Sequence, residues 1–293
     1  MPATIGELAI GVLQEQTKAF LEHSPGARAA QDPRPIHQMR VAARRMRAAL
    51  RLFGDLLPPD RAEHLNAELR WIAGQLGHVR DLDVQLRRLH DTATGLQLES
   101  ALEPYIAWLN DERHQAVDAL QAALNSARFM DLVEALHAVS TWTLPAAAAA
   151  VLHDDVPPRL KRVFKAFRKR ATRLRPKAPS DAFHRVRIRA KRLRYAAEFF
   201  APLYGKPAQK FIKRLTRVQD VLGELQDSVV AAERIKNAVA RQVSWPPETT
   251  LALGRIIEHD ARRAAKLKRQ FGDRYEEVAG KAWTRLESNV LMS

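Results

Sequence analysis

Two near copies of one short stretch decide the fold: HQMRVAARRMR at residues 37–47 and HRVRIRAKRLR at residues 184–194, 147 residues later. A second matched pair follows in the same order. It reads Leu76-Gly77-x-x-Arg80-Asp81 in the first case and Leu222-Gly223-x-x-Gln226-Asp227, at an offset of 146, in the second. Two matched blocks in one order indicate an internal duplication, which predicts two related halves.

Basic residues in both copies recur at the spacing of one helix face. In the first copy this row is His37, Arg40, Arg44, Arg47 and Arg51, and in the second it is His184, Arg187, Lys191 and Arg194. Separations of three and four residues place such side chains on one stripe. Arg45 and Arg192 lie beside the stripes, and Glu198 stands in the second copy where Arg51 stands in the first.

Apolar residues flank each basic row on both sides. In the first copy they are Met39, Ala43, Met46, Leu50 and Phe53 on one side and Val41, Ala48 and Leu52 on the other. A solvated charged face normally lies opposite the apolar face rather than inside it. Like charges beside a core are costly unless a partner neutralises them. Acids are scarce nearby, with only Asp55 in 36–57 and only Glu198 in 183–204. The pattern favours a bound anion.

Helix-forming residues dominate the whole chain, and no run of Val, Ile and Thr suggests a sheet. We expect an all-α protein in which each half supplies about four helices, the number in a small bundle. Helix breaks are expected at Pro25-Gly26, at Asn125-Ser126 and between Leu203 and Pro207. The expected division is a first bundle over 1–143, a linker over 144–158 and a second bundle over 159–293.

The net charge of +15 is concentrated in the second half, because residues 1–145 sum to −3 and the remainder to +18. Such asymmetry is expected of a protein with an anionic partner. Two further basic rows have helical spacing: Lys206, Lys210, Lys213 and Arg217 form one, and Arg255, His259, Arg262, Lys266 and Arg269 form the other. Ten basic residues and no acid stand between Arg159 and Lys177, including Lys165. That last run by itself is typical of a solvated helix face.

No cofactor and no metal are expected. The chain has no cysteine, which excludes disulfides and thiolate metal sites. Neither His37 nor His184 has a second histidine or a carboxylate three or four residues after it, so hydrogen bonding to an anion is favoured for both. The N-terminus does not read as a signal peptide, and the longest apolar stretch, 141–152, is too short to span a bilayer. These features predict a soluble, cytoplasmic protein without a membrane partner.

The duplicated pattern His-x-x-Arg-[VI]-x-x-[RK]-Arg-x-Arg, with the Leu-Gly-x-x-[RQ]-Asp blocks, resembles the CHAD family (conserved histidine α-helical domain) over nearly the whole chain. The resemblance implies two four-helix bundles related by a pseudo-twofold axis around a basic central pore. It also implies a stand-alone, non-catalytic binder of inorganic polyphosphate that associates with polyphosphate granules. By this resemblance, the rows that begin at His37 and His184 would bind the ligand, together with Arg45 and Arg192. The rows that begin at Lys206 and Arg255, and Lys165, would add to the same site.

Two other functions compete with polyphosphate binding. Weak, non-specific nucleic-acid binding is compatible with a pI near 10.5. A row set between apolar flanks, however, neither enters a duplex groove nor offers stacking aromatics. An all-α metal-dependent phosphohydrolase would need a metal or a positioned base. Asp81 and Asp83 are the nearest paired carboxylates, and no catalytic residue is predicted.

Overall fold

The computed structural model describes residues 2–241 and 244–292, with side chains through residue 288. In that part of the chain every regular element is helical, apart from one isolated antiparallel bridge between Thr4 and Val151. The expected all-α class is therefore confirmed, while the pseudo-twofold axis and the central pore stay predictions. The chain divides into two compact units. The first contains 1–87 and 108–156, and the second contains 88–107 and 157–293.

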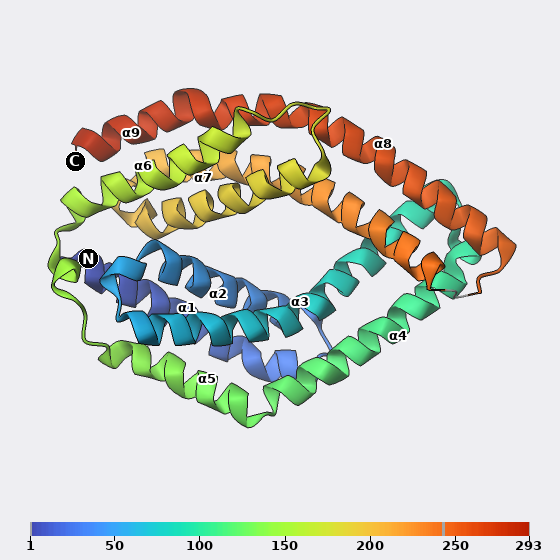
Figure 1. Ribbon diagram of the computed structural model, residues 1–293, viewed down its shortest axis with the longest axis horizontal. Coiled ribbons are helices and arrows are strands. Elements are labelled where there is room, and N and C mark those ends of the chain that lie inside the picture. Colours follow the sequence, from blue (N-terminus) through green and yellow to red (C-terminus); the bar gives the residue numbers. More distant parts are fainter. Residues whose placement is uncertain (1, 242–243, 293) are drawn as a thin grey trace. The chain divides into compact units, whose positions relative to one another are not determined.

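The first unit is built around α1 (Ile5–Ala29) and α2 (Pro33–Leu52), which pack side by side (Figure 1). Thr4 caps α1 by accepting a hydrogen bond from the Glu7 backbone N–H, at 3.2 Å. Asp32 caps α2 in the same way, and Pro33 occupies its first turn, where a missing N–H costs nothing. The unit's core consists of fully buried aliphatic and methionine side chains with few aromatics: Ile5, Leu13, Phe20, Ile36, Met39, Met46, Leu69 and Leu76.

Three further helices contribute to this unit, two of them only in part. They are α3 (Pro59–Leu96), α4 (Glu99–Leu124) and α5 (Ala127–His137). The break expected at Asn125-Ser126 is confirmed, since the Ser126 side chain caps α5. The break expected at Pro25-Gly26 is wrong. Helix α1 continues to Ala29 and ends where Ala30 adopts a left-handed conformation, with φ 53°, and donates to the Gly26 carbonyl.

The second unit contains α6 (Leu152–Ala171) from residue 157 on, α7 (Ser180–Ala240), α8 (Pro247–Glu277), a π-helical turn (Val278–Ala282) and α9 (Trp283–Met292). Its core is rich in aromatics. Phe183 meets Phe271 edge-on with ring centroids 5.8 Å apart, and Phe211 meets Trp283 at 5.7 Å. These pairs join α7 to α8 and α9, and edge-on geometry suits the ring quadrupoles.

Helix α7 is two helices joined at Gly205, whose φ of 51° and ψ of −130° are not helical. This backbone conformation is open mainly to glycine. The prediction of separate helices on either side of 203–207 therefore identifies a real discontinuity, although the backbone passes through it without a loop. The helix predicted after Pro207 extends to Gln242, which lies outside the described residues.

The boundaries of the two compact units do not coincide with the expected division into 1–143, 144–158 and 159–293. As an assignment of domains, that division stays a prediction. Residues 88–107, the end of α3 and the start of α4, group with the second unit. Tyr105 meets Trp245 there, with ring centroids 5.6 Å apart. The segment 144–158 is also more ordered than a linker, because it contains a 3-10 turn (Ala146–Ala149) and the first turns of α6.

Candidate functional site

The basic row of α2 lies at the border of the buried face of its helix. His37, Arg40, Arg44, Arg45 and Arg47 are half-buried, and only Arg51 is exposed. The flank of Met39, Ala43, Met46, Leu50 and Phe53 is buried as expected. The opposite flank is less so, because Val41 and Ala48 are only half-buried beside buried Leu52. The row is recessed on one side and open on the other.

Helix α3 supplies the groups that the α2 row contacts. The Arg40 Nη1 atom lies 2.9 Å from the Asp81 carboxylate, and the Arg47 Nε–H donates to the Asn66 side-chain oxygen at 3.3 Å. The Arg40 guanidinium passes over Gly77, where an added Cβ would stand 3.5 Å from Nε. The Leu-Gly-x-x-Arg-Asp block therefore presents a flat helical turn and a carboxylate to Arg40.

Helix α3 also adds cations that spacing along α2 does not reveal. Arg80 is half-buried, and its charge acts on both His37 and Arg40. Burial is the main cause that lowers the pKa of Arg80, while Asp83 opposes this change and Arg87 and Arg40 add to it. A signal is present in the sequence, because Arg80 belongs to the duplicated block and Arg87 follows it two helical turns later.

The pKa of His37 depends on its burial and on the charges around it. Burial first, and then the charges of Arg80, Arg40 and Arg44, lower its pKa below the ordinary value of 6.5. The pKa of Arg47 is lowered in the same sense by burial and by Arg51 and Arg70. Burial disfavours charge of either sign, but the arginine charges that add to it create a positive potential, and that potential favours an anion.

The second unit carries the matching row on the first half of α7. His184, Arg187, Lys191, Arg192 and Arg194 are all half-buried. Their flank of Val186, Ala190, Leu193 and Ala197 is buried, as are Tyr195 and Phe199 on the other side, whereas Ile188 is 38% exposed.

The second half of α7 packs against this row. The His184 Nδ1 atom lies 2.7 Å from the Gln226 side-chain oxygen, and the Gln219 amide donates to the Ala190 carbonyl at 2.8 Å. Carboxylates stand near the end of the row. Arg194 Nε is 3.6 Å from Glu198, and the charge of Arg194 also acts on Asp220. Burial is the main cause that raises the pKa of Asp220.

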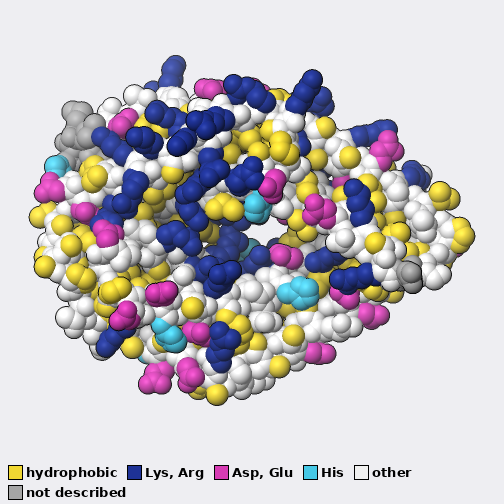
Figure 2. All heavy atoms as spheres, in the orientation of Figure 1, with side chains coloured by type: hydrophobic (Ala, Val, Ile, Leu, Met, Phe, Trp, Pro, Cys, Tyr) yellow, Lys and Arg dark blue, Asp and Glu magenta, His cyan; other side chains and the backbone are white. Residues whose placement is uncertain are grey.

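The remaining predicted binding residues, apart from His259, are on exposed surfaces rather than in recessed rows. Lys165, Lys206, Lys210, Lys213, Arg217, Arg255 and Arg262 are all exposed. Arg217 lies 3.5 Å from Glu277, and Arg262 lies 2.6 Å from Glu258. Figure 2 shows how densely Lys and Arg side chains gather over α6, α7 and α8 of this unit. These residues contribute to the positive field of the unit.

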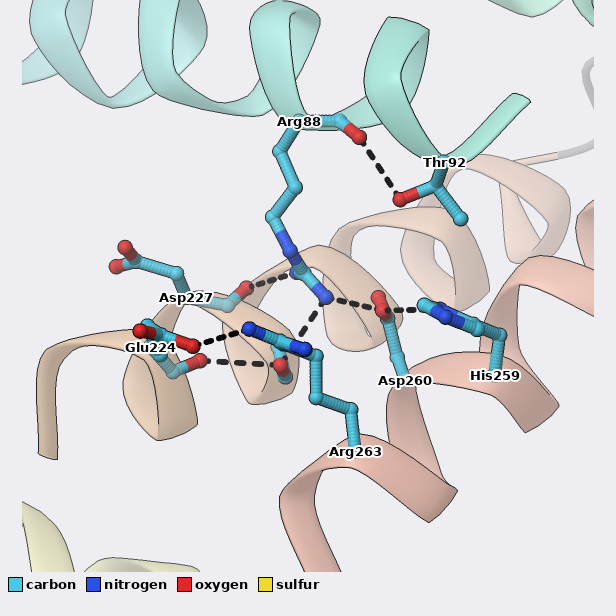
Figure 3. Close-up of polar contacts among 8 residues, drawn as sticks. Arg88, Thr92, Glu224, Asp227, His259, Asp260 and Arg263 are labelled. Carbon is cyan, nitrogen blue, oxygen red and sulfur yellow. Dashed lines mark hydrogen bonds and ion pairs between the residues drawn. The ribbon is translucent and has the colours of Figure 1, made fainter. Parts of the chain in front are cut away.

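His259 lies in a polar network instead (Figure 3). The Arg88 guanidinium donates to the Asp227 carbonyl at 2.9 Å and to the Ser228 hydroxyl at 3.0 Å, and it forms an ion pair with Asp260. Asp260 is 2% exposed, and the His259 Nδ1 atom is 3.6 Å from its carboxylate. Burial raises the pKa of Asp260, and the charge of Arg88 opposes that change.

A cavity of about 370 Å³ adjoins this network, and its walls carry both signs of charge. Its charged and titratable lining groups are Arg88, Asp91, Glu224, Asp227, His259 and Arg263. Arg263 forms an ion pair with Glu224. Three carboxylates oppose the cations here, so the surroundings of His259 do not resemble the recessed rows. Its predicted role in anion binding stays a prediction.

Neither a metal cluster nor a membrane helix stands out among the residues that the structure describes. Across 2–241 and 244–292, no three or more His, Asp or Glu side chains are placed to hold a metal ion. Over the same residues, no helix combines the length and the apolar character needed to cross a bilayer.

Comparison with protein families matches the CHAD domain model to residues 11–236. Two curated proteins of Mycobacterium tuberculosis are similar: Uncharacterized protein MT2285 of strain CDC 1551 / Oshkosh and Uncharacterized protein Rv2226 of strain ATCC 25618 / H37Rv. Each is 28% identical over 244 residues, which is 80% of this chain and 46% of the relative. The chain thus spans about half the length of these relatives.

Two solved structures share the fold. The CHAD domain from the plant Ricinus communis is 27% identical, with a TM-score of 0.78 over 96% of this chain and 93% of that one. PptA from Streptomyces chartreusis is 22% identical, with a TM-score of 0.77 over 94% of this chain and 100% of that one. The second likeness is one of fold alone.

Proposed function

The chain belongs to the CHAD family, and from this premise we propose that it binds inorganic polyphosphate, without turnover, through the basic rows of α2 and α7. The observation that carries the proposal is the half-burial of the α2 row together with the added charge of Arg80. Inorganic polyphosphate is the ligand that the family resemblance implies, and the geometry of each row is compatible with it.

The spacing of a row suits a thin chain that carries one charge per unit. Steps of three or four residues along a helix place a cation about every 5 Å. Arginine offers a fork of donors to phosphate oxygens, and such charge-assisted hydrogen bonds need no base for recognition. Half-burial strengthens each contact because the effective dielectric is lower than in bulk water and salt screens less. The charges of Arg80, Arg40 and Arg44, which add to burial in lowering the pKa of His37, indicate a positive potential at this place.

Nucleic-acid binding is less well supported by the same residues. Single strands are bound by aromatic side chains on which bases stack. The aromatics beside the second row, Tyr195, Phe199 and Phe200, are buried and contribute to the core. Duplex DNA would contact the exposed cations of the second unit only through its backbone, which gives weak and salt-sensitive binding.

Phosphate hydrolysis is not favoured either. Asp81 and Asp83, the nearest paired carboxylates, each pair with an arginine: Asp81 with Arg40 at 2.9 Å, and Asp83 with Arg113 at 2.7 Å. Each pairing uses one carboxylate oxygen, and the bound guanidinium competes with a metal ion or an attacking water for that group. We therefore infer a binding role.

Competition binding at physiological salt tests the proposal. Retention of long-chain polyphosphate is measured against single-stranded and duplex DNA of equal charge, with a parallel assay of phosphate release in Mg²⁺ or Mn²⁺. Replacing Arg44 or Lys191 by glutamine should weaken polyphosphate retention about tenfold each, the effect of losing a hydrogen bond to a charged group. Exposed Arg61 and Lys236 offer matched control substitutions in the two units.

Three outcomes would contradict the proposal. Preference for DNA would favour the nucleic-acid alternative, and phosphate release would favour the enzyme. Equal affinity of the Arg44→Gln and Lys191→Gln variants and their controls would remove the rows from the site. Association with polyphosphate granules is a further part of the proposal, and it is tested by following a fluorescently tagged chain in cells that accumulate polyphosphate.

A further inference from the structure

A second basic cavity lies in the second unit, between the end of α6 and the start of α7. It has a volume of about 440 Å³. One wall carries Lys169, Arg170 and Arg173 of α6 and the residues after it, and the other carries Arg185 and Arg189 of α7. The remaining lining residues, which we call the apolar floor, have small or aliphatic side chains: Ala166, Leu174, Ala178, Ala182 and Val186. We call this feature the α6–α7 groove.

The groove is separate from the basic row of α7. At 100° per residue, Arg185 and Arg189 each lie about 160° from the direction of Arg187, on the opposite side of the helix from that residue of the row. Neither residue belongs to the repeated pattern, and the run of cations at the end of α6 is by itself typical of a solvated face. The structure instead brings that run against a second set of cations.

The charges of the groove are nearly uncompensated. Among the described residues, Lys169, Arg170, Arg173 and Arg189 take part in no hydrogen bond or ion pair with another side chain. Arg185 pairs with Asp181 at 2.5 Å, and that carboxylate is 78% exposed. Asp181 is also the only acid between Asp155 and Glu198. Five cations thus line one small cavity whose lining includes no carboxylate, and Asp181 pairs with one of them.

We propose that the α6–α7 groove binds one compact oligophosphate, in the form of a triphosphate group. Arginine forks on two facing walls match a ligand with several phosphates close together. Each wall extends only about 6 Å, four residues at 1.5 Å, which suits a short run of phosphates rather than a long polymer. The volume lies in the range of small-ligand sites. The apolar floor can accept a non-phosphate part of the ligand.

Titration of the full chain with tripolyphosphate, with ATP and with orthophosphate tests this proposal. One variant removes two charges from the first wall (Arg170→Gln with Arg173→Gln), and another removes two from the second (Arg185→Gln with Arg189→Gln). Each should weaken tripolyphosphate binding at least tenfold and leave long-chain retention by the rows within about twofold. Lys191→Gln should show the opposite pattern. Far-UV circular dichroism verifies that each variant is folded.

The two sources of a triphosphate are distinguished by the ligands themselves. Tighter binding of ATP than of tripolyphosphate identifies a nucleoside triphosphate that uses the apolar floor, and equal binding identifies the triphosphate group alone; both support the site. The proposal is overturned if both wall variants bind tripolyphosphate like the unmodified chain, or if they lose affinity for single-stranded DNA only. Because the rows are assayed separately, failure of the groove leaves the proposed function standing, and the reverse also holds.

Discussion

Opposite His37 in the first unit lies Arg80, whereas opposite His184 in the second unit lies Gln226. These are equivalent positions of the two matched blocks, so a cation acts on the histidine of the first row where an amide contacts the histidine of the second. The far ends of the rows differ in the same direction. Arg51 ends the first row, and Glu198 stands at the equivalent place in the second.

The glycines of the two blocks show the same divergence. In the first unit the Arg40 guanidinium lies across Gly77, but an added Cβ at Gly223 in the second unit would meet no atom within 4 Å. Both rows thus have a carboxylate beside an arginine, Asp81 at Arg40 and Glu198 at Arg194, but the first row gains the cation Arg80 where the second has the amide Gln226. We expect the first row to bind the polyanion more tightly than the second.

The largest effect is expected from making the first unit like the second. Replacing Arg80 by glutamine should weaken polyphosphate binding by about 2 kcal/mol, because hydrogen bonds to charged groups contribute about 1.5–3 kcal/mol. Isothermal titration calorimetry measures the change. The exposed α3 residue Arg61 supplies a control with the same loss of charge. An unchanged affinity in Arg80→Gln would show that α3 takes no part in the site.

A smaller effect is expected from making the second unit more like the first. Glu198→Gln removes the carboxylate 3.6 Å from Arg194 and should strengthen binding by about 1 kcal/mol, the scale of one charge at short range in a partly solvated region. The same titration measures this change. The control is Asp131→Asn, which removes one carboxylate from the exposed surface of α5. Weaker binding in Glu198→Gln would mean that this carboxylate positions Arg194 for the ligand.

The pH dependence of binding should show whether His37 lies at the ligand. In the free protein, burial and three arginines hold the pKa of His37 below 6.5. A bound polyanion offsets those charges and raises this pKa, so binding takes up a proton. Affinity should therefore rise as pH falls from the pKa of the bound state to that of the free state, and stay level below the latter. A change of one pKa unit corresponds to about 1.4 kcal/mol at full protonation.

The test is a series of titrations between about pH 8 and about pH 5, on each side of the ordinary histidine pKa. His37→Gln should lose the increase in affinity at low pH, and comparison with the unmodified chain cancels the titration of the ligand itself. If His37→Gln keeps the full increase, the proton is taken up elsewhere and His37 is not at the ligand.

The smallest effects are expected at the two glycines. Gly223→Ala should stabilise the second unit by somewhat under about 1 kcal/mol, because alanine is the better helix former and the space is open. Polyphosphate binding should not change. Gly77→Ala gains the same propensity, but its methyl group would stand 3.5 Å from Arg40 Nε, in a van der Waals contact that restricts the guanidinium, so it should weaken binding slightly. Chemical denaturation and titration together separate these effects, and identical behaviour of the two variants would contradict the comparison.

Much of this arrangement follows from periodicity along single helices, and the rest depends on what helices do to one another. Spacing predicts Arg40 and Arg44 on one face, and repetition identifies the matching face that contains Lys191. Spacing along α2 cannot show that Arg80 of α3 joins the row, because that contact forms between helices. For the same reason the sequence does not predict the pairing of Arg40 with Asp81 or the α6–α7 groove.

Local turn chemistry explains the errors in the helix boundaries. Pro25 is expected to end the first helix, but it is exposed, and the chain continues one more turn to the left-handed Ala30. Gly205 is expected to fall in a loop, yet a single residue with an unusual backbone conformation is enough to separate two helices. Both outcomes depend on the conformation of one residue, which composition alone does not determine.

The path of the chain between the units has a consequence for its synthesis on the ribosome. Residues 88–107 belong to the second unit, although most of that unit is encoded after residue 156. Arg88 therefore emerges early, and its buried partner Asp260 emerges only when most of the chain has been made. The second unit cannot close during translation, and a fragment that stops at Val156 would leave the end of α3 without the surface it packs on.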